Sequence, residues 1–269
     1  MYFFTASKNQ KLSKEALEKI EGLSFGAIMK ALRDKDVKVN RIRTNKDVVL
    51  SIGDLVEIYI KKLKELCPCD LLFEDENVLV IDKKSGFTSE KTFEYLSKNQ
   101  QVYFIHRLDR NTSGVMIFAK NEVAEKELLK GFKNRDFKKI YKALVYKKFS
   151  KKEDVLTAYL KKDSKNSLVK IYDNCVKDSV QIKTGYKVIK ENENTSELRV
   201  ELFTGKTHQI RSHLAHVGHF ILGDGKYGKQ EINKQLGVKT LQLRSKELTL
   251  KFSKESPLVY LNNKTFQVE

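Results

Sequence analysis

Several residue types are scarce in this sequence, and each scarcity excludes a class of protein. The 269 residues include no tryptophan, two prolines and three cysteines, Cys67, Cys69 and Cys175. Three cysteines cannot build a disulfide framework, and an odd number without a signal peptide favours a reducing compartment. No stretch approaches the roughly 20 consecutive apolar residues that a membrane-spanning helix needs. We therefore expect a soluble, cytoplasmic protein that has no membrane partner.

Positive charge, in contrast, is abundant. The chain has 52 Lys and Arg against 35 Asp and Glu, a formal net charge of +17. The resulting pI, near 9.5, is typical of proteins that bind nucleic acids, although lysine bias alone also produces it. With 40% hydrophobic residues the chain can bury a core, which argues against general disorder. The charge predicts a polyanionic partner without identifying it.

Residues 1–64 predict a small domain of two helices followed by short strands. Apolar residues recur at helical spacing over 12–20, and Ser24 is a suitable N-cap for a second helix over 25–32. Beyond it the apolar period predicts three strands, at 37–39, 48–50 and 55–60. A polar connector that ends at Pro68 follows, and we place the domain boundary between residues 64 and 65.

Part of this domain resembles the RNA-binding module first seen in ribosomal protein S-four. The similarity comes from the helix at 25–32, the V-x-V-N turn at 37–40 and the G-D-x-V motif at 53–56. Arg41 stands where the module usually has glycine. The resemblance implies RNA binding by the basic residues of the helix and turn, although a solvated charged face is the alternative. Those basic residues include Lys30, Arg33, Lys38 and Arg41.

Residues 65–269 predict a larger second domain. Strands are expected at 78–82, 115–119, 140–146, 180–189 and 198–203, and helices at 122–132 and 207–217. Because strands and helices do not alternate regularly, the pattern favours an α+β fold with a mixed, mainly antiparallel sheet.

No motif for a cofactor or a metal is complete. Gly205-Lys206-Thr207 ends like a P-loop, but Val200 stands where the first glycine belongs. The segment Gly223–Gly228 fits G-x-G-x-x-G but lies in a polar turn outside any strand-helix-strand unit. The histidines between 213 and 219 lack the cysteines or carboxylates that would complete a metal site. We therefore expect neither a cofactor nor a metal.

The segment Tyr103–Lys120 places a charged turn between two apolar strands. Its turn contains a histidine, two arginines and Asp109. Ordering these groups together costs desolvation and conformational entropy. The turn is therefore either a structural ion-pair network or a site in which arginines keep Asp109 ionised as a nucleophile or base.

Three long motifs in this domain resemble those of the RluA family of pseudouridine synthases. The signature H-R-L-D-x-x-T-S-G-x-x-x-x-A-K spans His106–Lys120, and K-x-Y-x-A-L-V begins at Lys139. The third motif, T-G-K-T-H-Q-I-R-x-H, begins at Thr204 and continues with G-D-x-x-Y-G at Gly223. Their common order and spacing make chance agreement negligible. The resemblance implies an enzyme that isomerises uridines of RNA to pseudouridine, a reaction that needs no redox cofactor.

The resemblance also implies roles for individual residues. Asp109 would be the essential carboxylate, Arg211 would pair with it and keep it charged, and Tyr141 would stack on the flipped uracil and help remove its ring proton. The first step, addition to the base or attack at or proton removal from the ribose, stays open. RNA contacts in the site are expected from His106, Arg107, Arg110 and Thr112.

Two departures from the family pattern concern substrate contacts more than chemistry. Lys84 replaces the proline of a K-P-x-G loop, and Arg244 replaces the histidine of an L-H-[AS] motif. We expect a monomer that acts on large-subunit rRNA in preference to tRNA, because tRNA-directed relatives often lack the first module. A non-enzymatic RNA-binding protein that retains the fold is the alternative, and the intact Asp109, Tyr141 and Arg211 argue against it.

Overall fold

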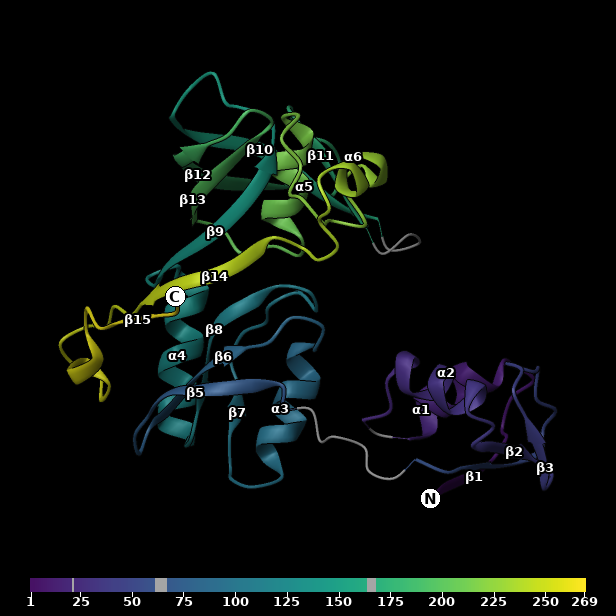
Figure 1. Cartoon of the computed structure of the whole chain (residues 1–269). Coiled ribbons are helices and arrows are strands. Elements are labelled where there is room, and N and C mark those ends of the chain that lie inside the picture. Colours follow the sequence, from purple (N-terminus) through teal and green to yellow (C-terminus); the bar gives the residue numbers. More distant parts are fainter. Residues whose placement is uncertain (21, 61–66, 164–167) are drawn as a thin grey trace. The chain divides into compact units, whose positions relative to one another are not determined.

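The protein consists of two compact units, Met1–Cys67 and Pro68–Glu269 (Figure 1). The computed structural model describes residues 1–20, 22–60, 67–163 and 168–269. The domain boundary predicted between residues 64 and 65 lies outside these described residues. Within the described ranges, no helix has the length and apolar character required to cross a membrane.

The first unit combines two helices with a four-stranded antiparallel sheet of order β1-β4-β2-β3. Its elements are β1 (Tyr2–Thr5), α1 (Leu12–Lys19), α2 (Phe25–Arg33), β2 (Val37–Val39), β3 (Ile42–Thr44) and β4 (Leu55–Ile58). Apolar side chains of both helices share one core with the sheet, among them Ala16, Ile28 and Val56. The burial of this shared face holds the helices on the sheet.

Local sequence signals in the first unit predict some elements correctly and others not. Ser24 caps α2 as predicted, since its Oγ accepts a hydrogen bond from the Ala27 amide at 3.1 Å. The strand predicted at 48–50 is wrong. Val49 makes an isolated bridge to Lys11, because this extended segment crosses the start of α1 instead of joining the sheet. The strands β1 and β3 were not predicted.

The second unit is built on an eleven-stranded mixed sheet. The main path of the sheet runs β11-β10-β12-β13-β9-β14-β8-β6-β5, while β15 pairs with β14 and β7 with β8. Its strands are β5 (Cys69–Glu74), β6 (Val78–Lys83), β7 (Tyr103–Phe104), β8 (Ser113–Ala119), β9 (Lys138–Tyr146), β10 (Glu153–Asp163), β11 (Leu168–Tyr172), β12 (Val180–Glu191), β13 (Thr195–Leu202), β14 (Leu243–Thr249) and β15 (Thr265–Gln267). The prediction of a mixed, mainly antiparallel sheet is confirmed.

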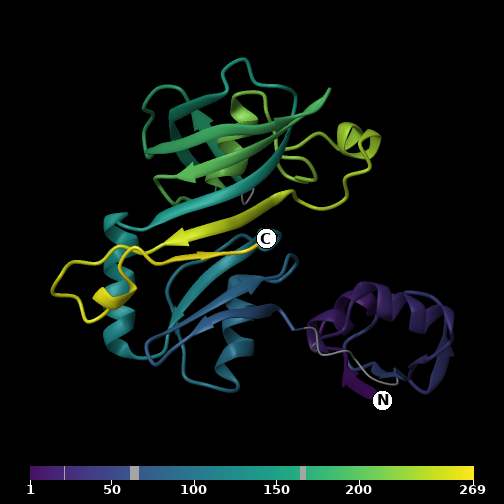
Figure 2. The same ribbon diagram turned by 60° about the vertical axis from the view of Figure 1, so that its left-hand side comes forward.

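Strand β14 lies at the centre of this sheet and joins its two halves (Figures 1 and 2). It runs antiparallel to β9 and parallel to β8. The contact with β8 requires glycine at position 114, because a Cβ there would lie 2.0 Å from the Ser245 carbonyl oxygen and the residue has φ +115°. The segment before β8 and the residues of β9 are thereby held on either side of β14.

Helices cover both halves of the sheet. They are α3 (Ser89–Ser97), α4 (Glu122–Asn134), α5 (Gln209–His216) and α6 (Gln230–Gln235), with a 3₁₀ turn at Val259–Leu261. Helix α4 packs on β7 and β8, and α5 packs on β11 and β12 (Figure 2). One large apolar cluster extends across both halves of the sheet and includes Leu108, Tyr141 and Ile210, and a second packs α4 against the other side chains of β6 and β8. The sequence segments of the three long motifs therefore meet in the middle of the unit.

Candidate active site

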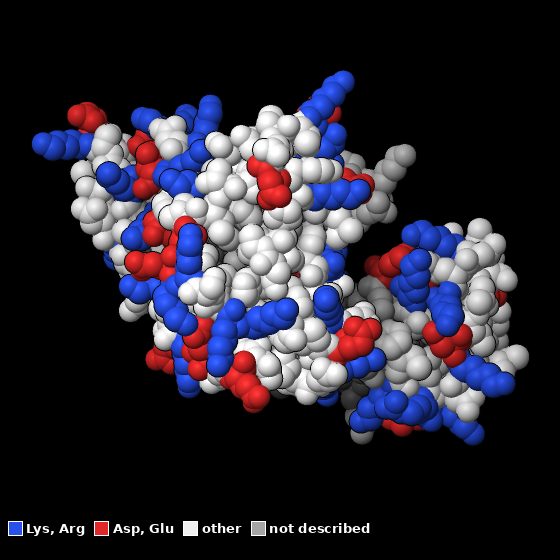
Figure 3. Space-filling view, turned by 90° about the horizontal axis from the view of Figure 1, so that it is seen from above, with Lys and Arg blue, Asp and Glu red and all other residues white. Residues whose placement is uncertain are grey.

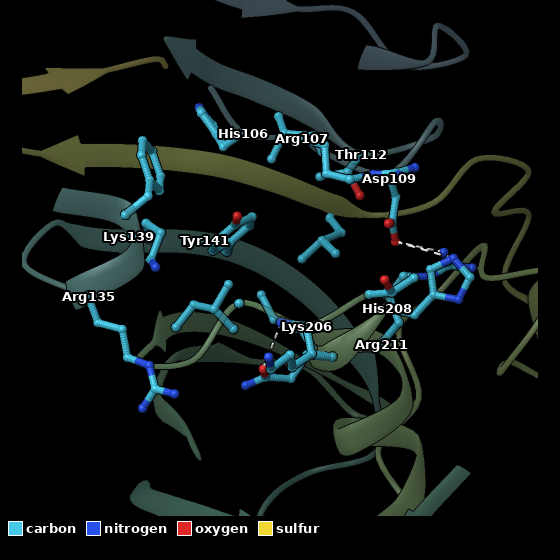
Figure 4. A pocket seen from close by; sticks show the side chains of 18 of the residues that line it. His106, Arg107, Asp109, Thr112, Arg135, Lys139, Tyr141, Lys206, His208 and Arg211 are labelled. Atoms are coloured by element: carbon cyan, nitrogen blue, oxygen red, sulfur yellow. Dashed lines mark hydrogen bonds and ion pairs between the residues drawn. The ribbon is translucent and has the colours of Figure 1, made fainter. Parts of the chain in front are cut away.

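A cavity of about 510 Å³ lies where these segments meet. Its walls come from the loop before β8, the end of α4, strand β9 and the segment that enters α5. Six residues predicted for the site line it: His106, Arg107, Asp109, Thr112, Tyr141 and Arg211 (Figure 4). Residues that are up to 137 positions apart in the chain, from 106 to 243, thus surround one space.

The loop that carries Asp109 is fixed by buried polar side chains. The Ser89 hydroxyl, at the start of α3, accepts from the Leu108 amide and donates to the Leu108 carbonyl, both at 2.9 Å. The fully buried Lys83 donates to the carbonyls of Lys84, Phe87 and Arg110. Burial lowers the pKa of Lys83 to about 8, although the nearby Asp109 opposes this shift. The loop is held in place before any substrate binds.

Asp109 shares an arginine with a second carboxylate. Arg211 Nη1 donates to Asp109 Oδ2 at 2.9 Å, while its Nε and Nη2 donate to the two oxygens of Asp224 at 2.7 and 2.8 Å. The bidentate pair with Asp224 fixes the plane of the guanidinium and therefore its position beside Asp109. Burial alone would lower the pKa of Arg211, but the two carboxylates outweigh it and raise the pKa.

Asp224 is fully buried and has four donors. Besides Arg211, the amides of Lys226 and Tyr227 donate to its Oδ1 at 2.8 and 3.2 Å. Burial would raise its pKa, yet these hydrogen bonds and the guanidinium keep the pKa below its usual range. Asp224 is therefore an anion in the folded protein and a rigid support for Arg211.

His208 completes this end of the cavity. Its Nδ1 lies 2.9 Å from the Tyr227 hydroxyl, which itself accepts a hydrogen bond from the Val169 amide. The other ring nitrogen, Nε2, lies 3.8 Å from Asp109 Oδ2. Burial lowers the pKa of His208, so the ring is neutral at pH 7. We call Asp109, His208, Arg211 and Asp224 the paired-charge end of the cavity.

Tyr141 lies on β9 between the two ends of the cavity (Figure 4). Its ring is buried in the wall, with 8% of the residue exposed. Burial raises the pKa of the phenol to about 12, a hydrogen bond with Ser245 opposes the shift, and Asp109 adds to it. The phenol is therefore protonated at neutral pH, and it presents a neutral aromatic face to a ligand.

Beyond Tyr141 the lining becomes cationic. Lys133 and Arg135 lie at the end of α4, and Lys139 lies at the start of β9 (Figure 4). We call these three residues the cationic end. His106 stacks on Phe132 beside it, with ring centroids 4.4 Å apart, and its Nε2 accepts from the Ile117 amide. Burial, together with Lys139, lowers the pKa of His106 to about 3, so this histidine adds no charge.

The remaining predicted contacts lie elsewhere. Arg110 is exposed and donates from Nε to the Gly86 carbonyl at 2.9 Å, and it is not part of the cavity lining. In the first unit, Lys38 donates to the Tyr59 hydroxyl. The other predicted RNA-binding residues of that unit, Lys30, Arg33 and Arg41, are solvent-exposed. On the face seen in Figure 3, Lys and Arg are interspersed with Asp and Glu and do not form one continuous patch.

Comparison with known proteins identifies the family. Residues 77–216 match the family model described as RNA pseudouridylate synthase. This range covers more than half of the chain and includes Asp109, Tyr141 and Arg211. The chain belongs to the RNA pseudouridylate synthase family. It is an isomerase that acts on RNA.

Individual relatives agree with this assignment to the RluA type of pseudouridylate synthase. The chain is 32% identical to an uncharacterized RNA pseudouridine synthase of Aquifex aeolicus, over 84% of this chain and 73% of the relative. It is 27% identical to ribosomal large subunit pseudouridine synthase C of Vibrio parahaemolyticus, over 88% of this chain and 83% of that protein. The structure of human RNA Pseudouridylate Synthase Domain Containing 1 matches with a TM-score of 0.62 and 21% identity, over 70% of this chain and 80% of that chain. This structural match shows the common fold.

Residues of the pseudouridylate synthase site that sequence reasoning missed act mainly through other residues. No role is assigned from the sequence to Lys83 or His208, and Asp224 is placed in the G-D-x-x-Y-G motif without a role of its own. The motif G-D-x-x-Y-G, which contains Asp224 and Tyr227, was the available signal. Arg244, the departure from the family pattern, pairs with Asp82 at 2.7 Å and does not line the cavity. No group of three His, Cys, Asp or Glu in the described part of the chain is placed to hold a metal.

Proposed function

We propose that this pseudouridine synthase modifies uridines of large-subunit ribosomal RNA, with Asp109 as the essential carboxylate. The pairing of Asp109 with a doubly anchored Arg211 at one end of the cavity carries this proposal. The name of the Vibrio parahaemolyticus relative supports ribosomal RNA as the substrate. The isomerisation breaks the bond between the uracil N1 and the ribose, rotates the base and joins the ribose to C5, after which C5 loses a proton and N1 gains one.

The two oxygens of Asp109 are available to different degrees. Arg211 Nη1, at 2.9 Å, and the neutral His208 Nε2, at 3.8 Å, both lie next to Oδ2. We therefore assign Oδ1 to the substrate and Oδ2 to the protein. Arg211 neutralises the carboxylate from one side, and the neutral His208 leaves the charge of the ion pair unchanged. The arrangement suits a carboxylate that must remain ionised in a cavity from which RNA excludes water.

Tyr141 serves in this proposal as the surface for the flipped uracil. A protonated phenol in the cavity wall supplies an aromatic face for stacking and a hydroxyl for hydrogen bonding. Because its pKa is raised, Tyr141 is protonated and cannot itself take the proton from C5. It could act as the base only if another group first accepted the phenolic proton. Arg107, which is exposed at the cavity rim, is available to phosphate or to the partner base of the flipped nucleotide.

The first unit would contribute RNA affinity away from the chemistry. Its exposed basic residues, Lys30, Arg33 and Arg41, support this role. We propose residues 1–64 as an RNA-binding domain and 65–269 as the catalytic domain of a monomer. Loss of the first domain is then expected to weaken binding or selectivity more than the chemical step.

Pseudouridine mapping tests the proposal. RNA is sequenced from cells with the gene, without it, and with Asp109→Asn in its place. We expect at least one pseudouridine of large-subunit rRNA to disappear on deletion and to return with the wild-type protein, but not with Asp109→Asn. Loss of sites in tRNA instead would correct the substrate, and restoration by Asp109→Asn would refute the role of Asp109.

A further inference from the structure

The charges around the cavity do not balance. Six of its lining residues are Lys or Arg, whereas Asp109 is the single carboxylate of the lining within the described chain. The charge of Arg211 is already paired with the carboxylates of Asp109 and Asp224. No carboxylate of the described residues forms an ion pair with Lys133, Arg135 or Lys139. The cationic end therefore keeps its positive charge until a ligand arrives.

Lysines on the other face of β9, in contrast, form ion pairs with carboxylates. Successive side chains of a strand point to opposite faces, so Lys138 and Lys142 point away from Lys139 and Tyr141. Lys138 pairs with Glu201 at 3.8 Å, and Lys142 with Glu197 at 3.0 Å. Carboxylates are thus within reach on the face outside the cavity, whereas the lysine on the cavity face has none among the described residues.

Lys139 is also held in a confined place. Its Nζ lies 5.9 Å from the centroid of the Phe132 ring, and a Cβ on Gly205 would lie 4.0 Å from it. Burial and, to a smaller extent, Arg135 lower the pKa of Lys139. A partly buried cation next to a like charge opposes folding. An anion bound between the end of α4 and the Gly205 segment would offset that cost.

Lys139 and Tyr141 are two residues apart on one strand and face the same cavity. This spacing separates their Cα atoms by about 7 Å along β9. A nucleotide whose base lies at Tyr141 would therefore direct one of its neighbouring phosphates toward the cationic end. The chemistry of three cations without a carboxylate selects a phosphate over an uncharged sugar or base.

We propose that the cationic end is a phosphate subsite, in which Lys139 binds the phosphodiester next to the uridine at Tyr141. Lys133 and Arg135 flank this group from the end of α4. The inference rests on the proposed function, because it takes the ligand at Tyr141 to be a nucleotide of RNA.

Salt-dependent binding tests the subsite with two neighbouring lysines. The probe is a short single-stranded RNA that contains one uridine, and its affinity is followed by fluorescence anisotropy over a series of salt concentrations. Lys139→Gln should reduce the slope of log K against log salt by about 0.7, the value for one phosphate contact on a single strand. Lys138→Gln, the matched control, should leave the slope unchanged. Lys139→Arg should keep the wild-type slope, because it retains the charge.

Uncharged methylphosphonate linkages locate the phosphate. Replacement of one linkage beside the uridine should weaken binding of the wild-type protein and of Lys138→Gln, but not of Lys139→Gln. Equal slopes for the two Gln variants, or the same sensitivity to the linkage in both, would overturn the subsite. If Lys139→Gln does not fold in a thermal scan, Lys139→Met gives the same comparison. The proposed function fails separately, if the wild-type protein forms no pseudouridine in the mapped RNA.

Discussion

The two ends of the cavity treat positive charge in opposite ways. At the paired-charge end, Arg211 is buried between Asp109 and Asp224 and makes three hydrogen bonds to them. At the cationic end, Lys133, Arg135 and Lys139 form no ion pair with a carboxylate of the described chain. The first arrangement is complete without RNA, and the second obtains its counter-charge from RNA. Preorganised charge serves the reacting atoms, whereas unbalanced charge serves binding.

The largest loss of stability and activity is expected when Asp224, which anchors Arg211 at the paired-charge end, is replaced. Asp224→Asn leaves Arg211 without half of its buried counter-charge, so the free energy of unfolding should fall by about 3 kcal/mol. The rate constant kcat should fall on the order of 30-fold, because the guanidinium is no longer fixed beside Asp109. Denaturant unfolding and single-turnover assays measure the two losses. Asp173→Asn, which removes an exposed carboxylate paired with His216, is the control and should change neither.

Acid should remove the difference between Asp224→Asn and the wild type. The pKa of Asp224 is lowered in the folded protein, so its contribution to stability is present above the pKa of the unfolded chain and is lost as the pH falls through the folded value. The two unfolding free energies should therefore converge below about pH 4. A constant gap down to pH 2 would contradict this account.

Lys83 is a third kind of buried cation, which can be compared with the two ends of the cavity. It has backbone carbonyls as acceptors in place of carboxylates. Lys83→Met should destabilise the protein by about 2 kcal/mol, since it removes the three hydrogen bonds that the buried ammonium donates to backbone carbonyls. Because burial lowers the pKa of Lys83 to about 8, the cost of burying its charge is relieved as the pH rises from 8 toward 10.5. The stability of the wild type relative to Lys83→Met should rise over that range.

Tyr141, between the two ends, tests whether ionisation contributes to the chemistry. Tyr141→Phe removes a hydroxyl and should slow the single-turnover rate about tenfold, the equivalent of one hydrogen bond. With a pKa of about 12 the phenol is protonated at both pH 7 and pH 9, so the ratio of the two rates should be the same at both. A ratio that grows with pH would instead indicate that the phenolate acts as a base.

The smallest effect on stability is expected at the cavity rim. Arg107 lies 3.5 Å from Glu90, and their side chains are 64% and 49% exposed. Arg107→Gln should change the free energy of unfolding by less than about 0.5 kcal/mol. RNA affinity should nevertheless fall at low salt, because an exposed cation loses a phosphate contact. Unchanged affinity would remove Arg107 from the RNA-binding surface.

Sequence patterns predicted those parts of the fold that depend on local signals. Ser24 capped the helix expected after it, and the apolar run at 78–82 formed β6. The strand β10 was not predicted, because the apolar residues of 153–163 stand next to one another, at 155–156 and 158–160, and do not alternate with polar ones, although burial alternates along the folded strand. The segment at 48–50 is apolar and extended, yet its backbone partners are residues 10 to 12 and not a sheet. Whether such a segment joins a sheet depends on contacts with distant parts of the chain, which a local sequence pattern does not reveal.

The site was predicted to a similar extent. Asp109 and Arg211 were paired by resemblance, and their side chains are 2.9 Å apart. Asp224 was missed because a carboxylate in a glycine-rich turn is normally solvated, and its complete burial results from contacts with α5. The lack of a carboxylate partner for Lys139 depends on which face of β9 the glutamates of β13 occupy. That face can be known only from the register of β9 against β13.

The position of β14 has a consequence for biosynthesis. Residues 243–249 are inserted between β8 and β9, which precede them in the chain by about a hundred residues or more. While a ribosome is still making the protein, Asp109 and Tyr141 belong to two sheet fragments that lack their common neighbour. The nascent chain therefore brings Asp109 and Tyr141 together on one sheet only after β14 has emerged.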